Sequence, residues 1–423
     1  MLEWLKTLAP HDGGAHDGGA PSAVGWRVNS HIHLPPNFSA FATVDHALDQ
    51  ACEEKIGVLG ASNYYDFSVY ETFDRQARER GIFPLFGVEI VAMDDALKRS
   101  GKRVNDPDNP GKIYVCGKGI VRFAPMSEAA ERLMQLIRRN DTVRMKAMTE
   151  KLRTAMSALG VERMPTHDAI VAAVARRGGA RPEQVVLQER HLAQAAQVAL
   201  FDAIPLETRA ARPARIFKAP CDAPNDPAAV QNAVRAGWLK AGRPCFEEEH
   251  FVSTEQARAL VHALGGIFCY PVLADGAGRR CECETPTDAL IDMLKGKGVS
   301  MVEFIPHRNT VETLTETART LRAAGFVIAA GTEHNVAMSA SLEPVCRDGH
   351  PVPPDIQSLF REGACVIAAH QFLTARGERG LTDDGDGPAS DRAGRERSIR
   401  TLRETGVRVL DAFWRQAKGE NQT

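Results

Sequence analysis

The feature that most restricts the fold of this chain is an alternation of short apolar segments with segments of helical spacing. Apolar segments predicted as buried strands lie at 24–34, 56–62, 82–93, 265–275, 299–306, 325–335 and 364–373. Segments with helical spacing follow or separate them, at 43–54, 68–80, 286–297, 311–324, near 354–362 and at 391–417. Such alternation is typical of βα units that build a parallel sheet. The sequence therefore predicts an α/β fold with seven candidate barrel strands.

A long middle segment interrupts this alternation. Residues 126–250 are rich in Ala and Arg, with helical spacing at 127–158, 166–177, 182–203 and 227–241. We interpret 126–250 as a helical insertion between two parts of the barrel, 23–125 and 251–423, the second of which includes a C-terminal helix. Residues 112–123 (KIYVCGKGIVRF) are predicted as an extra strand pair or an excursion. Residues 1–22, which contain HDGGA twice, are interpreted as a flexible leader.

Composition excludes some classes of partner. Among 423 residues, 52 Lys and Arg stand against 54 Asp and Glu, a net charge of -2. A protein that coats nucleic acid or binds anionic membranes would carry a basic excess, and no apolar run is long enough to span a bilayer. Nine cysteines without a disulfide-like spacing, and an N-terminus without a secretion-signal pattern, favour a reducing cytoplasm. We expect a cytoplasmic protein with a small-molecule partner, and the oligomeric state stays open.

Polar side chains gather at the carboxyl ends of the predicted strands, where βα barrels place their active sites. His31 and His33 end the first strand two residues apart, so both imidazoles face one side of it. Such a pair can hold one cation, and imidazole suits zinc, iron or manganese better than magnesium or calcium. A pair of histidines that binds no metal is the alternative.

Two glutamates end later predicted strands. Glu89 follows the apolar segment FPLFGV, and Glu333 follows the strand FVIAAG. A buried carboxylate needs a partner, because burying a lone charge is costly. That partner is either a Lys or Arg in a salt bridge or a metal ion. Two histidines and two glutamates would neutralise a divalent cation and still leave a position for water.

The order of these motifs resembles that of the PHP (polymerase and histidinol phosphatase) family. The family pattern runs H-x-H, T-D-H, G-x-E, H-P and G-S-D-x-H. The matching segments here are His31-Ile32-His33, Ser62-Asn63-Tyr64, Gly87-Val88-Glu89, Tyr270-Pro271 and Gly331-Thr332-Glu333-His334-Asn335. The resemblance covers about 28–93 and 265–335. It implies a distorted, TIM-like (β/α)7 barrel in which His31, His33, Glu89 and Glu333 bind a first metal.

Departures from the family pattern imply a reduced site. Family members usually hold two or three metals, but here tyrosine or asparagine stands at several ligand positions, namely Asn63, Tyr64, Tyr270 and Asn335. Neither residue type is a good ligand for a transition metal. We therefore expect one divalent transition metal ion: zinc, manganese or iron. Tyr64 and Tyr270 become candidates for substrate binding. His334, displaced by one residue from the family position, is a candidate catalytic residue.

Basic residues near the expected barrel mouth are candidates for binding an anionic substrate. Lys118 lies between glycines in CGKGI and either anchors an anion or is an exposed lysine in a hairpin turn. Arg190 and His191 lie at the start of a predicted helix, where free N–H groups favour anions. They either cap the substrate or belong to a solvated helix face.

Two more histidines end predicted strands. His307 is followed by Arg308 in FIPHRN, and His370 lies in AAHQF. Histidine is the natural acid or base near neutral pH, so both are candidate catalytic residues. Arg308 is a candidate for substrate binding. A structural role is the alternative for each histidine.

Together these features favour a metal-dependent hydrolase that uses a metal-activated water. The resemblance implies a phosphoesterase acting on a small phosphorylated or anionic metabolite, although a fold does not fix a function. Two alternatives stay open. One is a degenerate PHP module that binds a metal or ligand without catalysis. The other is a metal-assisted lyase or deacylase that acts on a sugar acid.

Overall fold

The computed structural model describes residues 2–10, 26–36, 39–178, 180–209, 221–335, 341–381 and 392–417. The chain divides into two compact units. The barrel unit comprises Met1–Leu34, Ser39–Met134 and Val252–Thr423, and the helical unit comprises Pro35–Phe38 and Gln135–Phe251.

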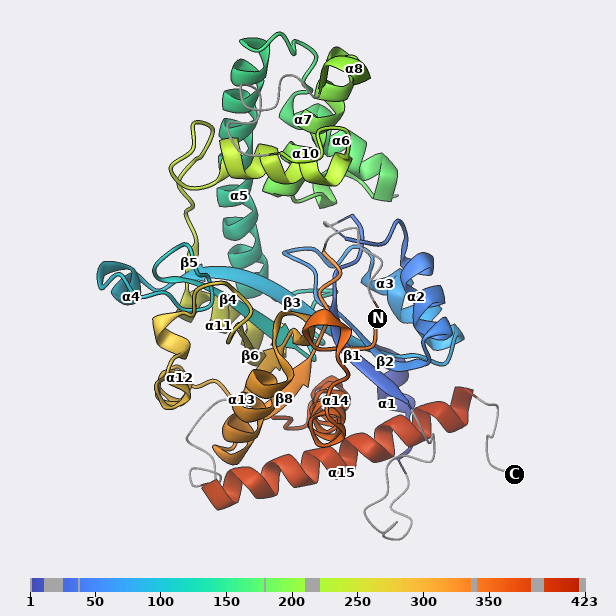
Figure 1. Ribbon diagram of the computed structural model, residues 1–423. Helices are drawn as coiled ribbons and strands as arrows, with labels where there is room; N and C mark the ends of the chain where they lie inside the picture. The colour runs from blue at the N-terminus through green and yellow to red at the C-terminus, as the bar shows by residue number, and fades with distance from the viewer. Residues whose placement is uncertain are drawn as a thin grey trace. The chain divides into compact units, whose positions relative to one another are not determined.

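Strands of the barrel unit form one nearly closed sheet (Figure 1). Their bounds are β1 Arg27–Ile32, β2 Ile56–Ala61, β3 Phe83–Met93, β4 Lys112–Lys118, β6 Ile267–Val272, β7 Met301–Phe304 and β8 Val327–Ala330. Neighbours in the sheet follow this order, and the short β5 (Val252–Ser253) pairs with β3. A bridge between Ile32 and Glu333 links the two ends of the sheet. The fold is a distorted TIM-like barrel, as the sequence predicts.

The strand β4 belongs to the barrel, so the predicted segment 112–123 contains one extra strand rather than a pair, and the alternative of an excursion is wrong. It pairs antiparallel with β3 on one side and with β6 on the other. The other neighbouring strands of the barrel are parallel. A single antiparallel strand interrupts the βα alternation without leaving the sheet, which is why periodicity alone leaves an extra strand pair and an excursion open.

The predicted strand at 364–373 is instead the middle of helix α14 (Pro354–Ala375). Every residue from Gly363 to Phe372 is buried, so this part of the helix is buried on all sides. A short apolar run of this kind cannot be distinguished from a buried strand by periodicity. The count of seven barrel strands is therefore right, but β4 takes the place of this segment.

Helix α14 also completes one edge of the barrel through Gln371. The first residues of β3, Phe83–Phe86, pair with β2, whereas pairing with β4 begins only at Gly87. Gln371 supplies the missing partner, because its Oε1 accepts from the Phe86 amide at 2.7 Å and its Nε2 donates to the Pro84 carbonyl at 3.2 Å.

Most helices of the barrel unit connect successive strands. They are α2 Val44–Glu53, α3 Tyr70–Glu79, α4 Asp95–Arg99, α11 Thr254–Ala263, α12 Thr287–Gly296 and α13 Val311–Ala323, with short 3₁₀ turns at Glu282–Glu284, Pro306–Arg308 and Arg347–Gly349. Side-chain oxygens of Thr43, Ser253 and Thr310 accept from backbone amides at the starts of α2, α11 and α13. Such caps fix where each helix begins. The long helix α15 (Arg392–Ala417) packs against α14.

The beginning of the chain is part of the barrel unit. Helix α1 (Glu3–Thr7) buries Leu5 completely, and the Trp4 indole donates to Asp74 at 2.8 Å and contacts Phe83 edge-on. The flexible-leader prediction is therefore wrong for residues 2–10, because these two apolar side chains anchor the segment. The HDGGA repeat at 11–20 lies outside the described residues.

The helical unit has a hydrophobic core of its own. Its helices are α6 His167–Gly178, α7 Glu189–Ala203, α8 Leu206–Arg209 and α10 Pro227–Val234, with a 3₁₀ turn at Pro182–Gln184 and a π-helical turn at Arg235–Leu239. The helix α5 (Glu128–Ser157) begins in the barrel unit and contributes Met145, Met148 and Leu152 to this core. Among the described helices of either unit, none combines the length and apolarity needed to cross a membrane.

Candidate metal site

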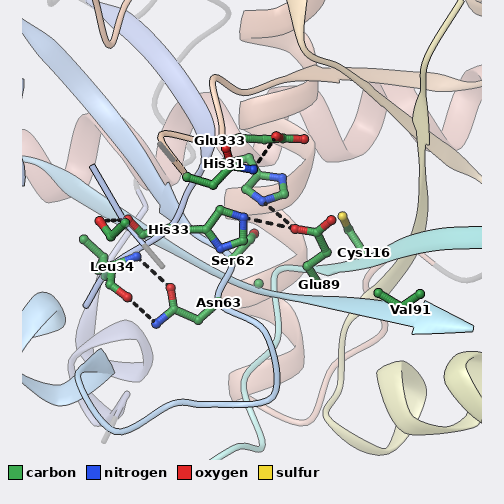
Figure 2. A network of polar contacts seen from close by, with 12 residues as sticks. His31, His33, Leu34, Ser62, Asn63, Glu89, Val91, Cys116 and Glu333 are labelled. Atoms are coloured by element: carbon green, nitrogen blue, oxygen red, sulfur yellow. Dashed lines mark hydrogen bonds and ion pairs between the residues drawn. The ribbon is translucent and has the colours of Figure 1, made fainter. Parts of the chain in front are cut away.

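Three of the four predicted ligands meet inside the barrel. His31 lies on β1, His33 follows it, and Glu89 lies in the middle of β3. Potential ligand atoms of the three side chains lie within 4.8 Å of one another, and all three residues are buried. The Glu89 Oε2 atom is 3.5 Å from His31 Nε2 and 3.1 Å from His33 Nε2 (Figure 2).

The residues present fit a divalent transition metal. Among the described residues, His31 Nε2, both ring nitrogens of His33, and Glu89 Oε2 are buried without a well-aligned hydrogen bond. Buried polar atoms are rarely left in this condition. Two imidazole nitrogens and a carboxylate oxygen are the ligands that zinc and related metals prefer. A cation shared by these atoms would satisfy them together.

A carboxylate that was not predicted from the sequence contacts His31 at Nδ1, the ring nitrogen that does not face Glu89. Glu303 on β7 is completely buried, and its Oε2 atom lies 2.7 Å from His31 Nδ1. The signal for it was present in the sequence, since Glu303 is a single charge within the apolar segment VSMVEFIP. No motif marks it, and only the closed barrel brings β7 opposite β1.

Lys118 is also part of this interior network, which corrects its prediction as a substrate anchor or an exposed turn residue. Its side chain is 2% exposed, and its Nζ lies 2.6 Å from Glu303 Oε1. It further donates to the Ser30 carbonyl at 3.1 Å and to Ser62 Oγ at 3.3 Å. Because an ammonium has three N–H groups, these three acceptors use all of them.

The interior charges shift the pKa values of the site. Burial and Lys118 lower the pKa of His31, but Glu303 and Glu89 more than offset them and raise it to about 9. Burial raises the pKa of Glu303, but Lys118 and His31 outweigh it and lower the value to about 2. The two histidines likewise hold the pKa of Glu89 well below its usual range despite burial. Both carboxylates are therefore ionised near neutral pH.

The carboxylate of Glu333, the fourth predicted ligand, contacts Arg308 and Asn335. Its Oε2 atom forms an ion pair with Arg308 and accepts from Asn335 Nδ2 at 2.8 Å. Its backbone is close to the site, because its amide donates to the His31 carbonyl and its carbonyl accepts from the His33 amide. Glu333 and His334 both have positive φ angles, 59° and 48°. Consecutive non-glycine residues in this region store strain, which is common at functional sites.

The residues at the T-D-H position support the histidines. The Asn63 side chain accepts from the Leu34 amide at 2.7 Å and donates to the Leu34 carbonyl at 3.0 Å, which fixes the chain just after His33 (Figure 2). The Tyr64 ring stacks on the His33 ring, with centroids 5.0 Å apart and planes 11° apart. Tyr64 therefore covers His33 and remains a candidate for substrate contact.

Three further candidates surround Glu333 beyond the strand ends. His307 and Arg308 form a 3₁₀ turn after β7, and burial together with the Arg308 charge lowers the pKa of His307. His334 is buried, with its Nδ1 atom 2.6 Å from Thr332 Oγ1 and its ring stacked on Phe41. Their catalytic roles remain predictions.

Two predicted site residues are buried and contact other parts of the barrel unit. Tyr270 is fully buried and donates to Glu284 Oε1 at 2.7 Å. His370 lies on α14 rather than at a strand end, and its Nε2 atom is 3.0 Å from the Gly265 carbonyl. Gly265 precedes β6, so this contact is at the amino end of that strand, opposite the end where barrel active sites form. The prediction of His370 as a strand-end catalytic residue is therefore wrong.

Arg190 and His191 belong to α7 of the helical unit. His191 Nδ1 accepts from the Gln188 amide at 2.9 Å, which caps the start of its own helix. Burial and the Arg177 charge lower the pKa of His191 to about 3, so the ring is neutral. Their predicted role in substrate binding remains a prediction.

Comparisons of the sequence find no matching family model and no matching curated protein. Solved structures do match. One is described as a metal-dependent phosphoesterase from Bifidobacterium adolescentis, with a TM-score of 0.52 and 17% identity over 80% of this chain and 96% of that one. Another is an amidohydrolase from Chromobacterium violaceum with bound sulfate and no metal, with a TM-score of 0.50 and 18% identity over 79% and 95%. The chain shares their fold.

Proposed function

We propose that this protein is a metal-dependent hydrolase and a divergent member of the PHP family. One divalent transition metal ion, zinc, manganese or iron, is held by His31, His33 and Glu89. The observation that carries the proposal is the convergence of their buried ligand atoms, which lack other aligned partners among the described residues. Glu333 is a fourth ligand if its carboxylate leaves Arg308. When bound, such a metal lowers the pKa of a coordinated water to about 7.

The surrounding residues suit a small phosphorylated or anionic metabolite. Arg308 is 35% exposed beside the strand ends, and a guanidinium matches phosphate or carboxylate geometry. His307 is next to it, and its lowered pKa keeps the ring neutral, able to accept a proton. Tyr64 covers one face of His33. The similar phosphoesterase supports phosphoester hydrolysis.

Amide hydrolysis is the second candidate, because the other similar structure is described as an amidohydrolase. The ligand set serves either reaction, since both need a water activated next to a polarised acyl or phosphoryl group. We place the protein and its small-molecule substrate in the cytoplasm.

The test is a joint measurement of metal content and turnover. We expect about one transition metal ion per chain in the purified protein, and turnover on a panel of phosphoesters, esters and amides. His31→Ala and Glu89→Gln should lose the metal, whereas His350→Ala, at an exposed histidine, should keep it. A wild-type protein without transition metal would contradict the proposal. Bound metal without turnover on any compound would favour a binding module.

A further inference from the structure

Glu303 is surrounded by hydrogen-bond donors from across the barrel. Its Oε1 atom contacts Lys118 Nζ at 2.6 Å and Ser30 Oγ at 2.9 Å. Its Oε2 atom contacts His31 Nδ1 at 2.7 Å and, more weakly, Cys116 Sγ at 3.9 Å. These groups come from β1, β4 and β7, so the network crosses the interior of the sheet. A buried carboxylate is tolerated only when it is paired and hydrogen-bonded in this way.

The network determines which nitrogen of His31 carries a proton. An ionised carboxylate can only accept hydrogen bonds, so His31 Nδ1 must donate to Glu303. Without a metal the ring is cationic near neutral pH, because its pKa is raised to about 9. Once Nε2 has lost its proton, either to make room for a metal or above about pH 9, the lone pair is on Nε2, the atom that faces Glu89 and lacks an aligned partner among the described residues. His33 differs, since neither of its ring nitrogens has such a hydrogen bond. Among the described residues, His31 is therefore the one of the two histidines whose ring is oriented by an aligned side-chain hydrogen bond.

We propose that Glu303, with Lys118 as its counter-charge, is a positioning residue that fixes the Nδ1–H tautomer of His31 and so presents Nε2 to the metal. This proposal rests on the proposed function for its metal part, whereas the tautomer itself does not depend on a metal. Carboxylates that hold a ligand histidine in this way typically change metal affinity by 10–100-fold when they are mutated.

A second metal ion is a different use of the same residues. Potential ligand atoms of His31, Cys116 and Glu303 also lie within 4.8 Å of one another. Lys118 already contributes a positive charge to the Glu303 carboxylate, and its three N–H groups are used there. A divalent cation at the same carboxylate would be repelled by this ammonium. We therefore assign Glu303 and Lys118 to positioning His31, and we expect no second metal ion at Glu303.

The discriminating variant is Glu303→Gln. Lys118 and Ser30 both donate, so they will hold the amide oxygen and leave the amide NH₂ facing His31 Nδ1. An NH₂ group donates, which forces Nδ1 to accept and moves the ring proton to Nε2. An amide in place of such a carboxylate gives the wrong tautomer in the serine protease triad. We expect zinc to bind 10–100-fold more weakly to this variant.

Two readouts test the proposal. In ¹⁵N-histidine NMR, the wild type should show a protonated His31 Nδ1 with and without zinc, and Glu303→Gln should lose that signal. Titration calorimetry should show the weaker zinc binding. Glu284→Gln is the matched control, because Glu284 is also a buried glutamate and has no hydrogen bond with His31. It should leave both readouts unchanged.

The outcomes separate the two proposals. If the wild type binds zinc and Glu303→Gln binds it within about twofold, positioning is wrong and the hydrolase proposal stands. If the wild type binds no metal, the hydrolase proposal fails, and the Nδ1 signal recorded above about pH 9, where the ring is neutral, still decides the tautomer. If the single variant does not fold, the double variant Glu303→Gln, Lys118→Met removes both buried charges and should show the same loss of zinc affinity. Two zinc ions per wild-type chain, with one bound at Cys116, would overturn the assignment.

Discussion

Arg308 forms an ion pair with Glu333 at the point where the barrel closes. The Glu333 side chain is 10% exposed and that of Arg308 is 35% exposed, so the guanidinium reaches solvent while the carboxylate stays inside. The backbone of Glu333 is hydrogen-bonded to both His31 and His33. One residue thus connects a surface cation to the backbone of the two metal-site histidines. An anionic substrate that binds Arg308 competes with Glu333 for it.

Replacement of this arginine should affect both substrate binding and stability. In Arg308→Gln we expect KM for an anionic substrate to rise at least tenfold, because a charge-assisted contact is worth about 1.5–3 kcal/mol. The free energy of unfolding should fall by about 1–3 kcal/mol, because the Glu333 carboxylate, only 10% exposed, keeps Asn335 but loses its counter-charge. Steady-state kinetics and urea unfolding measure the two effects. Arg319→Gln, which removes an exposed pair with Asp355, should leave KM unchanged.

The buried carboxyl group of Glu284 should make stability depend on pH. Burial raises its pKa from 4.5 to about 7, although the Leu273 and Ala274 amides and the Tyr270 hydroxyl donate to it. Between these values the folded state holds a proton that the unfolded chain has lost. Stability from this group is present below about pH 4.5 and is lost as the pH rises toward 7, by up to about 3 kcal/mol.

Urea unfolding at several pH values measures this effect. Subtracting the curve of Glu284→Gln from that of the wild type should isolate a decline in stability across this range. A pH-independent difference between the two proteins would show that Glu284 ionises normally in the folded state.

The side chain of Gln371 should be important for stability, because it pairs with the edge of β3. In Gln371→Leu the Phe86 amide and the Pro84 carbonyl lose their partner, and each buried unsatisfied group costs about 1–3 kcal/mol. We expect a loss of about 2–5 kcal/mol in the free energy of unfolding. Gln357→Leu on the same helix removes a bond to the Val352 carbonyl and a long one from Arg361 at 3.4 Å, both partly exposed, and should cost about 1 kcal/mol or less. Equal losses would contradict the edge-pairing role.

Close packing between α14 and α15 depends on a glycine. A Cβ atom at Gly406 would lie 1.9 Å from the Cys365 carbonyl oxygen, which cannot move without shifting the α14 backbone. We expect Gly406→Ala to lower the free energy of unfolding by about 1–3 kcal/mol, as overpacking does. Gly296→Ala is the opposite control, because nothing lies within 4 Å of that position and alanine favours a helix by roughly 0.5–1 kcal/mol. Thermal unfolding should show opposite signs for the two variants.

The hydrophobic spacing within each short segment was enough to predict most strands and helices of the barrel. The strands that end at His31 and Glu333 and the helices between strands follow from hydrophobic spacing, since each element buries one face. The two errors have different causes. The antiparallel strand β4 breaks the βα alternation although it stays in the sheet. The middle of α14 is buried on all sides, and a short segment of this kind carries no periodicity that separates strand from helix.

The candidate site was predictable only where residues share a motif. His31 and His33 are neighbours on one strand, and Glu89 matches a family position, so sequence brings these three together. Glu303 and Lys118 become partners of His31 only through barrel closure. Neither has a sequence neighbour that points to a metal. The same reason explains Glu333, whose pairing with Arg308 is a tertiary contact.

The contact between Gln371 and β3 also determines when the barrel can be completed during synthesis. Phe86 and Gln371 are 285 positions apart in the chain. At about 5–20 residues per second, roughly 15–60 seconds pass between the appearance of the strand and that of its partner. Through this interval the Pro84 carbonyl and the Phe86 amide at the edge of β3 lack their partner. Unpaired edges recruit strands from other chains. Ribosomes that stall before codon 371 should therefore release a product that aggregates.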